Sequence, residues 1–245
     1  MRFSQAWLVA RHDIRLIRTR KGILIGLIAF PLAVGIGFPL LIDYIATSGG
    51  AASASYLPQL IDAFSFWFVI AGASLPTSIA AYAIVGEKVE KSLEPLLSTP
   101  TTDGEILLGK VLAAFIPTLL AIWAGSIVFM ALTDWAVWGV FGHLYFPNTE
   151  MAVILLALAP LACLYSVEVS IVVSSRVTDV RSAQQYAGVV FLPLILLYVA
   201  GEIGEPTLNT ENLLIISGIF VVIVFALFQA STRTFHREEI LTRWK

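Results

Sequence analysis

A few side chains in this sequence could do chemistry, and their spacing argues against catalysis. Ser74, in the run Gly72-Ala73-Ser74, could act as a nucleophile, but no histidine lies within an apolar segment to serve as its base. Cys163 is the only cysteine, so an intrachain disulfide and a cysteine-based metal site are both excluded. The three histidines are isolated from one another. We therefore expect a non-catalytic protein with no metal site.

Nucleotide and nucleic-acid signatures are also missing from the sequence. The chain has no Gly-x-x-x-x-Gly-Lys-Ser/Thr loop, whose backbone amides would hold nucleotide phosphates. Its basic residues are spread thinly among the flanks of apolar segments, which does not favour nucleic-acid binding. We expect no cofactor in this chain, and any linked ATP hydrolysis is expected on another chain.

Glu168 is the one acidic residue well inside an apolar segment. A charged side chain at bilayer depth costs roughly 2.5–3.5 kcal/mol on insertion scales, so this residue should face protein or water. It could be an intramembrane polar site on a substrate path. The alternative is a hydrogen bond to a neighbouring helix, with Tyr165, Ser166 and Ser170 close by in the sequence. The second interpretation is favoured.

The composition predicts an all-α membrane protein. Of its 245 residues, 58% are hydrophobic and only 13% are charged, against about 25% charged residues in soluble proteins. Crossing a bilayer takes about 20 apolar residues per helix. We predict a single transmembrane domain over residues 1–245, and six transmembrane helices at about 22–46, 61–86, 105–133, 150–175, 185–201 and 212–230. Prolines inside most of these segments should kink their helices.

The distribution of charge predicts the topology. All fifteen Lys and Arg residues fall in four segments, and none lies in the three loops at about 47–60, 134–149 and 202–211. The basic segments are 1–21, 87–110, 176–185 and 231–245. Because loops rich in Lys and Arg stay on the cytoplasmic side, both termini are predicted to be cytoplasmic, with residues 231–245 as a cytoplasmic tail. The loop at 134–149 is rich in aromatic residues, as is typical of an interfacial belt on the outer side.

Residues 1–21 predict an amphipathic helix that lies in the membrane interface. Phe3, Trp7, Ala10, Ile14 and Ile17 recur at helical spacing and form one apolar stripe. Arg11, Arg15 and Arg18 run along the shoulder of that stripe, where they would reach lipid phosphates. We expect Trp7 and these three arginines to anchor the helix to the membrane. The alternative is a plain basic flank that only enforces topology.

The predicted cytoplasmic loop at 87–104 is the most structured polar stretch. Val89, Leu93, Leu96 and Leu97 share one helical face, and charged residues cover the rest. Thr102 and Glu105 have the spacing of a capping box at the start of the next helix. Exposed leucines surrounded by charge indicate a docking surface, although they could equally pack on the protein's own helix ends or on lipid.

The run Glu94-Pro95-Leu96-Leu97-Ser98-Thr99-Pro100, followed by Glu105 and Gly109-Lys110, resembles the loop of type-2 ATP-binding-cassette exporter permeases. The basic N-terminal helix, the six-span layout and the length extend the resemblance over essentially the whole chain. One departure is Lys91-Ser92, where the family often has Gly-Thr.

The resemblance implies a coupling helix that docks into the ATPase subunit of the transporter. The implied ATPase contacts are Glu87, Glu90, Leu93, Glu94, Leu97 and Pro100. It also implies that Glu105 caps the third span and that Lys110 anchors its membrane end. The expected function is the permease subunit of an ATP-driven exporter in the cell membrane, with ATP and Mg²⁺ bound by the ATPase partner. A second permease copy and membrane lipid are the other expected partners.

Two other kinds of function stay open at this point. The chain could be a self-contained secondary carrier or channel, for which Glu168 is the one supporting residue. It could also be a membrane assembly factor that does not transport. The sequence does not indicate which cargo is moved.

Overall fold

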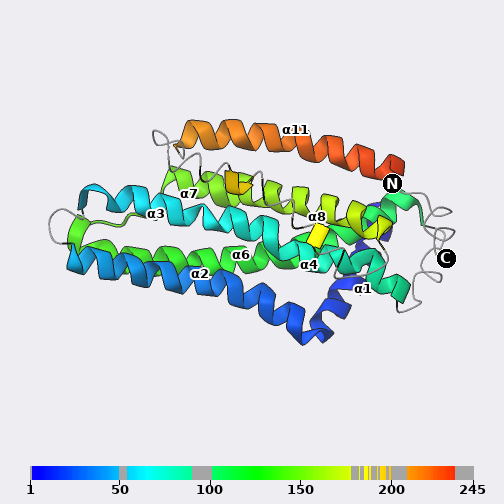
Figure 1. The fold of residues 1–245 in the computed structure, drawn as a ribbon, viewed down its shortest axis with the longest axis horizontal. Coiled ribbons are helices and arrows are strands. Elements are labelled where there is room, and N and C mark those ends of the chain that lie inside the picture. Colours follow the sequence, from blue (N-terminus) through cyan, green and yellow to red (C-terminus); the bar gives the residue numbers. More distant parts are fainter. Residues whose placement is uncertain are drawn as a thin grey trace.

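The computed structural model is an elongated bundle of helices (Figure 1). It describes residues 2–49, 54–89, 101–177 and 209–234, together with scattered residues between 182 and 199. The described residues form helices and no strands, which confirms the prediction of an all-α protein. Five of the described helical segments are long and apolar enough to cross a membrane. Most of the predicted fifth span, 185–201, lies outside the described residues.

The helices run back and forth along the bundle in chain order (Figure 1). A short helix α1 (Phe3–Thr19) precedes α2 (Lys21–Ser48), and α3 (Leu57–Ser65) leads into α4 (Trp67–Val89). The longest of the described helices is α6 (Asp103–Phe141). The chain returns through α7 (Thr149–Val153), a π-helical turn η2 (Ile154–Leu158) and α8 (Ala159–Arg176), and α11 (Thr210–Thr234) follows. We call the end of the bundle that carries α1 the α1 end.

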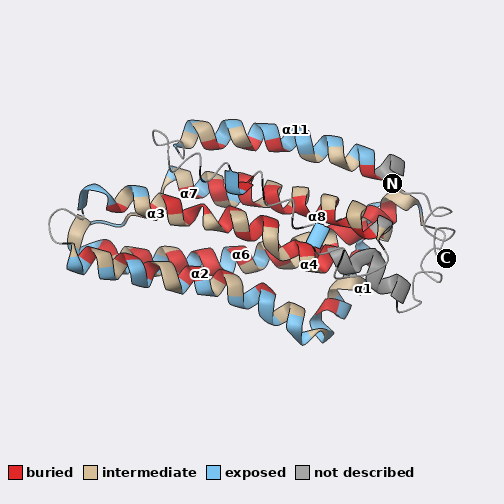
Figure 2. Cartoon of the chain, viewed as in Figure 1, coloured by how far each residue is buried: buried red, intermediate tan, exposed pale blue. Residues whose placement is uncertain are grey.

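Burial is concentrated where α4, α6 and α8 face one another, while α11 and the outer side of α2 are largely exposed (Figure 2). Phe68 and Phe129 are fully buried and meet edge to face, with ring centroids 5.5 Å apart. A second buried cluster, which includes Ile17, Leu107 and Val167, joins α1, α6 and α8 near the α1 end. Exposed apolar faces on the outer helices are what a bundle surrounded by lipid requires.

Helix α6 is longer than the predicted span, 105–133. It continues through the aromatic segment to Phe141, with Gly139 inside the helix, and ends at Gly142. Gly142 has a φ of 69° and ends the helix in the left-handed conformation that glycine adopts at little cost. The first half of the 134–149 loop is therefore helical and leaves Trp135 and Trp138 exposed.

The π-helical turn η2 was not predicted from the sequence, and Pro160 explains one of its contacts. In a π-helix the amide of residue 160 would bond to the carbonyl of Leu155, but proline has no N–H to donate. The indole Nε1 of Trp123, on α6, donates to this carbonyl over 3.1 Å instead. A neighbouring helix thus satisfies the backbone acceptor that the proline leaves without its helical donor, as membrane helices require.

Candidate functional site

The start of α6 and the start of α1 are held together by one carboxylate. Thr102 is the N-cap of α6, and its hydroxyl accepts a hydrogen bond from the amide of Glu105, 3.4 Å away. The Oε2 atom of Glu105 accepts from the amide of Thr102 at 3.0 Å, which completes the capping box. This confirms the cap predicted from the Thr-x-x-Glu spacing. The Oε1 atom of Glu105 accepts from the backbone nitrogen of Arg2, the N-cap of α1, at 2.6 Å.

Further contacts along α6 fix α1 against it. A Cβ added at Gly109 would stand 2.7 Å from the Cβ of Val9 and 2.8 Å from the carbonyl oxygen of Ala6, so only glycine allows this approach. At the next residue, the ammonium of Lys110 is buried and lies 3.7 Å from the carboxylate of Asp13. Lys110, whose predicted role was to anchor the membrane end of this helix, therefore has its charge paired with protein.

Part of the predicted apolar stripe of α1 is buried against the bundle, and part of it is exposed. Of the predicted stripe, Ala10 and Ile17 are buried and Ile14 is half-buried. Ala6 and Val9, which the predicted stripe did not include, are buried too, and α1 lies mainly against α6. Phe3 and Trp7 remain exposed, Trp7 by 42%. Arg11, Arg15 and Arg18 are exposed as well. The exposed residues form an apolar and cationic surface on α1 that does not face the bundle, as a helix in the membrane interface would need.

The predicted ATPase contacts fall mostly outside the described residues. Glu87 belongs to the last turn of α4, but its side chain is not described. The others, Glu90, Leu93, Glu94, Leu97 and Pro100, lie between 90 and 100, which the structure does not describe. Helix α4 ends, and α6 begins, at the α1 end of the bundle (Figure 1). The predicted docking segment is therefore bounded on both sides by helices that meet at the α1 end.

Glu168 lies on α8 and is 3% exposed. Its Oε2 atom is buried and has no hydrogen-bond partner among the residues that the structure describes. Ser166 does bridge helices, because its hydroxyl donates to the carbonyl of Ala73 on α4. The hydroxyl of Ser170 is buried and, within the same described part of the chain, likewise has no hydrogen-bond partner. The favoured interpretation, a hydrogen bond from this carboxyl group to a neighbouring helix, is therefore not seen for Oε2.

Sequence reasoning missed a polar network at the opposite end of the bundle. The hydroxyl of Tyr145 lies 2.8 Å from Oδ1 of Asp62 on α3 and donates to it. Burial, with the adjacent Asp62 carboxylate, raises the pKa of the Tyr145 phenol, so the hydroxyl keeps its proton. Oδ1 of Asp134 accepts from the amides of Tyr145 and Phe146 at 2.8 and 2.9 Å. The bond from Tyr145 fixes the loop after α6 against α3, and the bonds to Asp134 fix the same loop against the end of α6. Only the aromatic and acidic residues of 134–149 could have signalled them.

The apolar helices define an integral membrane protein, and the comparison with known families defines its class. Residues 7–216, most of the chain, match the family model described as ABC-2 family transporter protein. The protein therefore belongs to the ABC-2 transporter permease family and is a membrane permease component of an ABC transporter. The resemblance that the sequence showed is confirmed. No curated protein matches the chain.

Proposed function

We propose that this protein is the permease subunit of an ATP-driven exporter and that it receives the work of ATP hydrolysis from a separate ATPase subunit. Family membership over residues 7–216 carries the proposal. The helices α4 and α6, which flank the 87–100 segment, reach the α1 end together, and this arrangement supports one docking surface there (Figure 1).

The contacts in this proposal are those that the resemblance implied. Leu93 and Leu97 would fill the apolar part of the ATPase cleft, and Glu87, Glu90 and Glu94 would meet its charged rim. Pro100 ends the segment three residues before α6 begins at Asp103. ATP and Mg²⁺ bind to the ATPase partner, and this chain contributes no cofactor site.

The membrane arrangement belongs to the same proposal. Six spans with both termini in the cytoplasm place the α1 end, with its arginines, on the cytoplasmic side of the cell membrane. The described helices support a sixth span. Helix α8 ends at the α1 end and α11 begins at the opposite end, so the chain between them has to cross the membrane once more (Figure 1). Two permease copies pair to make the full exporter, and membrane lipid surrounds them.

Docking is tested by pairing the purified protein with the ATPase that co-purifies with it. We expect Leu93→Asp and Leu97→Asp to abolish co-purification, because a carboxylate buried in an apolar cleft without a partner is strongly disfavoured. The ATPase activity that the permease stimulates should fall in the same two variants. Size-exclusion chromatography of each variant alone checks that the spans remain folded.

Leu144→Asp is the matched control, because Leu144 is 61% exposed in the loop at the opposite end of the bundle. This variant adds the same charge and should pair normally. Normal pairing and stimulated ATPase activity in the Leu93 and Leu97 variants would falsify the docking surface. Transport by the chain alone, driven by an ion gradient without ATP, would favour a secondary carrier instead.

A further inference from the structure

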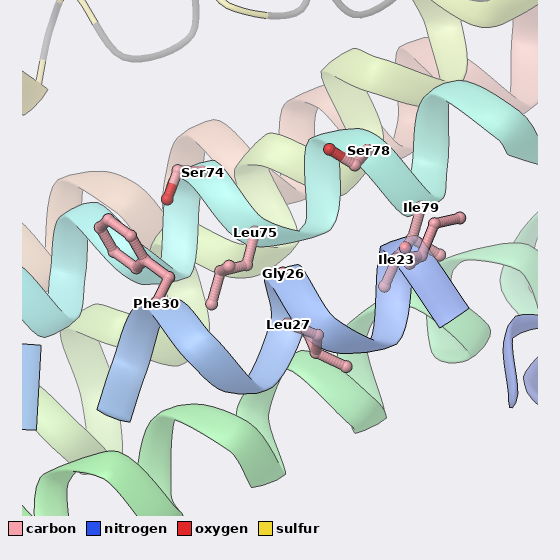
Figure 3. A pocket seen from close by; sticks show the side chains of 9 residues that line it. Ile23, Gly26, Leu27, Phe30, Ser74, Leu75, Ser78 and Ile79 are labelled. Carbon is pink, nitrogen blue, oxygen red and sulfur yellow. The ribbon is translucent and has the colours of Figure 1, made fainter. Parts of the chain in front are cut away.

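A groove of about 450 Å³ lies between α2 and α4, toward the α1 end (Figure 3). Its volume is within the roughly 300–1,000 Å³ that small-molecule sites occupy. One wall is the first half of α2 and the other is the middle of α4. The residues that matter to the argument are Gly22, Gly26 and Phe30 on α2, and Ser74, Ser78 and Ile79 on α4.

Small residues on both walls leave this space open. A Cβ added at Gly22 or Gly26 would meet nothing within 4 Å, so neither glycine is needed for helix packing. Ser74 and Ser78 are one turn apart on α4 and line the opposite wall. Helix α2 packs mainly on α6, and α4 packs mainly on α8, so the two walls contact each other little.

The groove offers a hydrocarbon surface. The hydroxyl of Ser74 donates to the carbonyl of Ala71 in its own helix at 3.3 Å, so it does not require a polar ligand. Ile23, Leu27, Phe30, Leu75 and Ile79 supply most of the remaining lining (Figure 3). Both walls belong to helices apolar enough to cross a membrane, so the molecules available to fill the groove within the bilayer are lipid chains.

The end of the groove at Gly22 is cationic. Lys21 directly precedes Gly22 at the start of α2 and is exposed. Arg18, in the last turn of α1, is exposed three residues earlier. Two exposed cations within the four residues that precede Gly22, a residue that lines the groove, complement an anionic headgroup attached to a hydrocarbon chain.

We propose that this groove is a binding site for an anionic phospholipid of the leaflet at the α1 end, with one acyl chain between α2 and α4 and its phosphate at Lys21 and Arg18. The lipid is a resident of the protein and is distinct from the transported cargo. The site does not depend on ATPase docking and goes beyond the proposed function.

Native mass spectrometry of the full-length protein in mild detergent, with added phosphatidylglycerol or phosphatidylcholine, tests this site. The wild type should retain phosphatidylglycerol in preference to phosphatidylcholine. Gly26→Leu should lower its retention at least tenfold, because the new side chain fills the groove without meeting protein atoms. Gly37→Leu is the control, since Gly37 lies on the same helix, also has open space and does not line the groove.

Arg18→Gln with Lys21→Gln tests the headgroup without changing the groove. Each lost cation should weaken phosphatidylglycerol binding about fivefold, and binding of phosphatidylcholine should not change. Equal retention of the two lipids by the wild type, or undiminished phosphatidylglycerol in Gly26→Leu, would overturn the proposal. A change from dimer to monomer in Gly26→Leu, with lipid retained, would show that a second copy occupies the groove.

Discussion

The Oε1 atom of Glu105 lies 2.6 Å from the backbone nitrogen of Arg2, across 103 positions of sequence. The same carboxylate closes the capping box of α6 through Oε2. One side chain therefore satisfies amide donors at the starts of two helices, which would otherwise have no intrahelical partner. Since α1 packs on α6, and α6 begins three residues after Pro100, this bond ties the interfacial helix to the helix that follows the predicted docking segment.

Glu105→Ala should loosen both helix starts. The variant removes two hydrogen bonds from backbone amides to a carboxylate, while the Thr102 hydroxyl still caps α6, so stability should fall by about 2 kcal/mol. Hydrogen exchange should accelerate at the amides of Gln5 and Ala6 and at the first turn of α6. Glu105→Gln should be intermediate, because its amide keeps one oxygen acceptor and the capping box accepts Gln.

Glu211→Ala is the control for this prediction, because Glu211 is an exposed acid in the first turn of α11. It should leave exchange in α1 unchanged. Unaltered exchange in α1 of the Glu105→Ala variant would mean that the bond to Arg2 contributes nothing to the position of α1.

Gly109→Leu should separate α1 from α6. Its Cβ would lie 2.7 Å from the Cβ of Val9 and 2.8 Å from a backbone oxygen, and the backbone cannot move aside without the helix. Overpacking of this kind typically costs about 1–3 kcal/mol. Protease sensitivity of α1 in detergent should rise, while Gly139→Leu, made where the space is open, should not change it. Equal protection of α1 in the two variants would contradict the close packing.

Trp123→Phe tests the bond that replaces the amide missing at Pro160. The carbonyl of Leu155 would lose its donor on α6 while the aromatic packing is largely kept. Interhelical hydrogen bonds in membrane proteins contribute about 0.6 kcal/mol on average, with a maximum near 1.7. Because a π-helical carbonyl facing lipid has no ready substitute, we expect a loss near the upper value in thermal unfolding. Trp135→Phe, at an exposed position nearer the end of α6, should be neutral.

Glu168→Gln should leave the stability of the protein unchanged or raise it. The Oε2 atom of Glu168 is buried without a hydrogen-bond partner among the described residues, so the amide gives up no bond there. It also removes the cost of holding a charge at this depth. Glu168→Lys should fail to accumulate, since it places an ammonium in the same surroundings. A loss of several degrees in the melting temperature of Glu168→Gln would indicate that the carboxylate has an essential partner.

Local patterns predicted well what depends on neighbours in sequence. The Thr102–Glu105 cap and the helix over 3–19 follow from spacing alone, and both are present. The pairing of Lys110 with Asp13 and the bond from Glu105 to Arg2 could not be predicted, because they require knowing that α1 docks on α6. The turn η2 was missed because every residue of Ile154–Leu158 is apolar, so the sequence shows no change of period at this single π-helical turn.

The topology inferred from the charge distribution can be tested by thiol labelling in intact cells, because the single native thiol, Cys163, is fully buried. Trp135→Cys should react with a membrane-impermeant maleimide added outside, since Trp135 is 71% exposed near the end of α6 away from α1. Lys91→Cys should react only after the cells are permeabilised, because position 91 lies in one of the basic segments, and segments rich in Lys and Arg stay on the cytoplasmic side. Reaction of the two cysteines from the same side would contradict the alternation of the spans. Reaction of Lys91→Cys alone from outside would mean that the whole protein has the opposite orientation in the membrane. The docking segment would then be out of reach of any cytoplasmic ATPase.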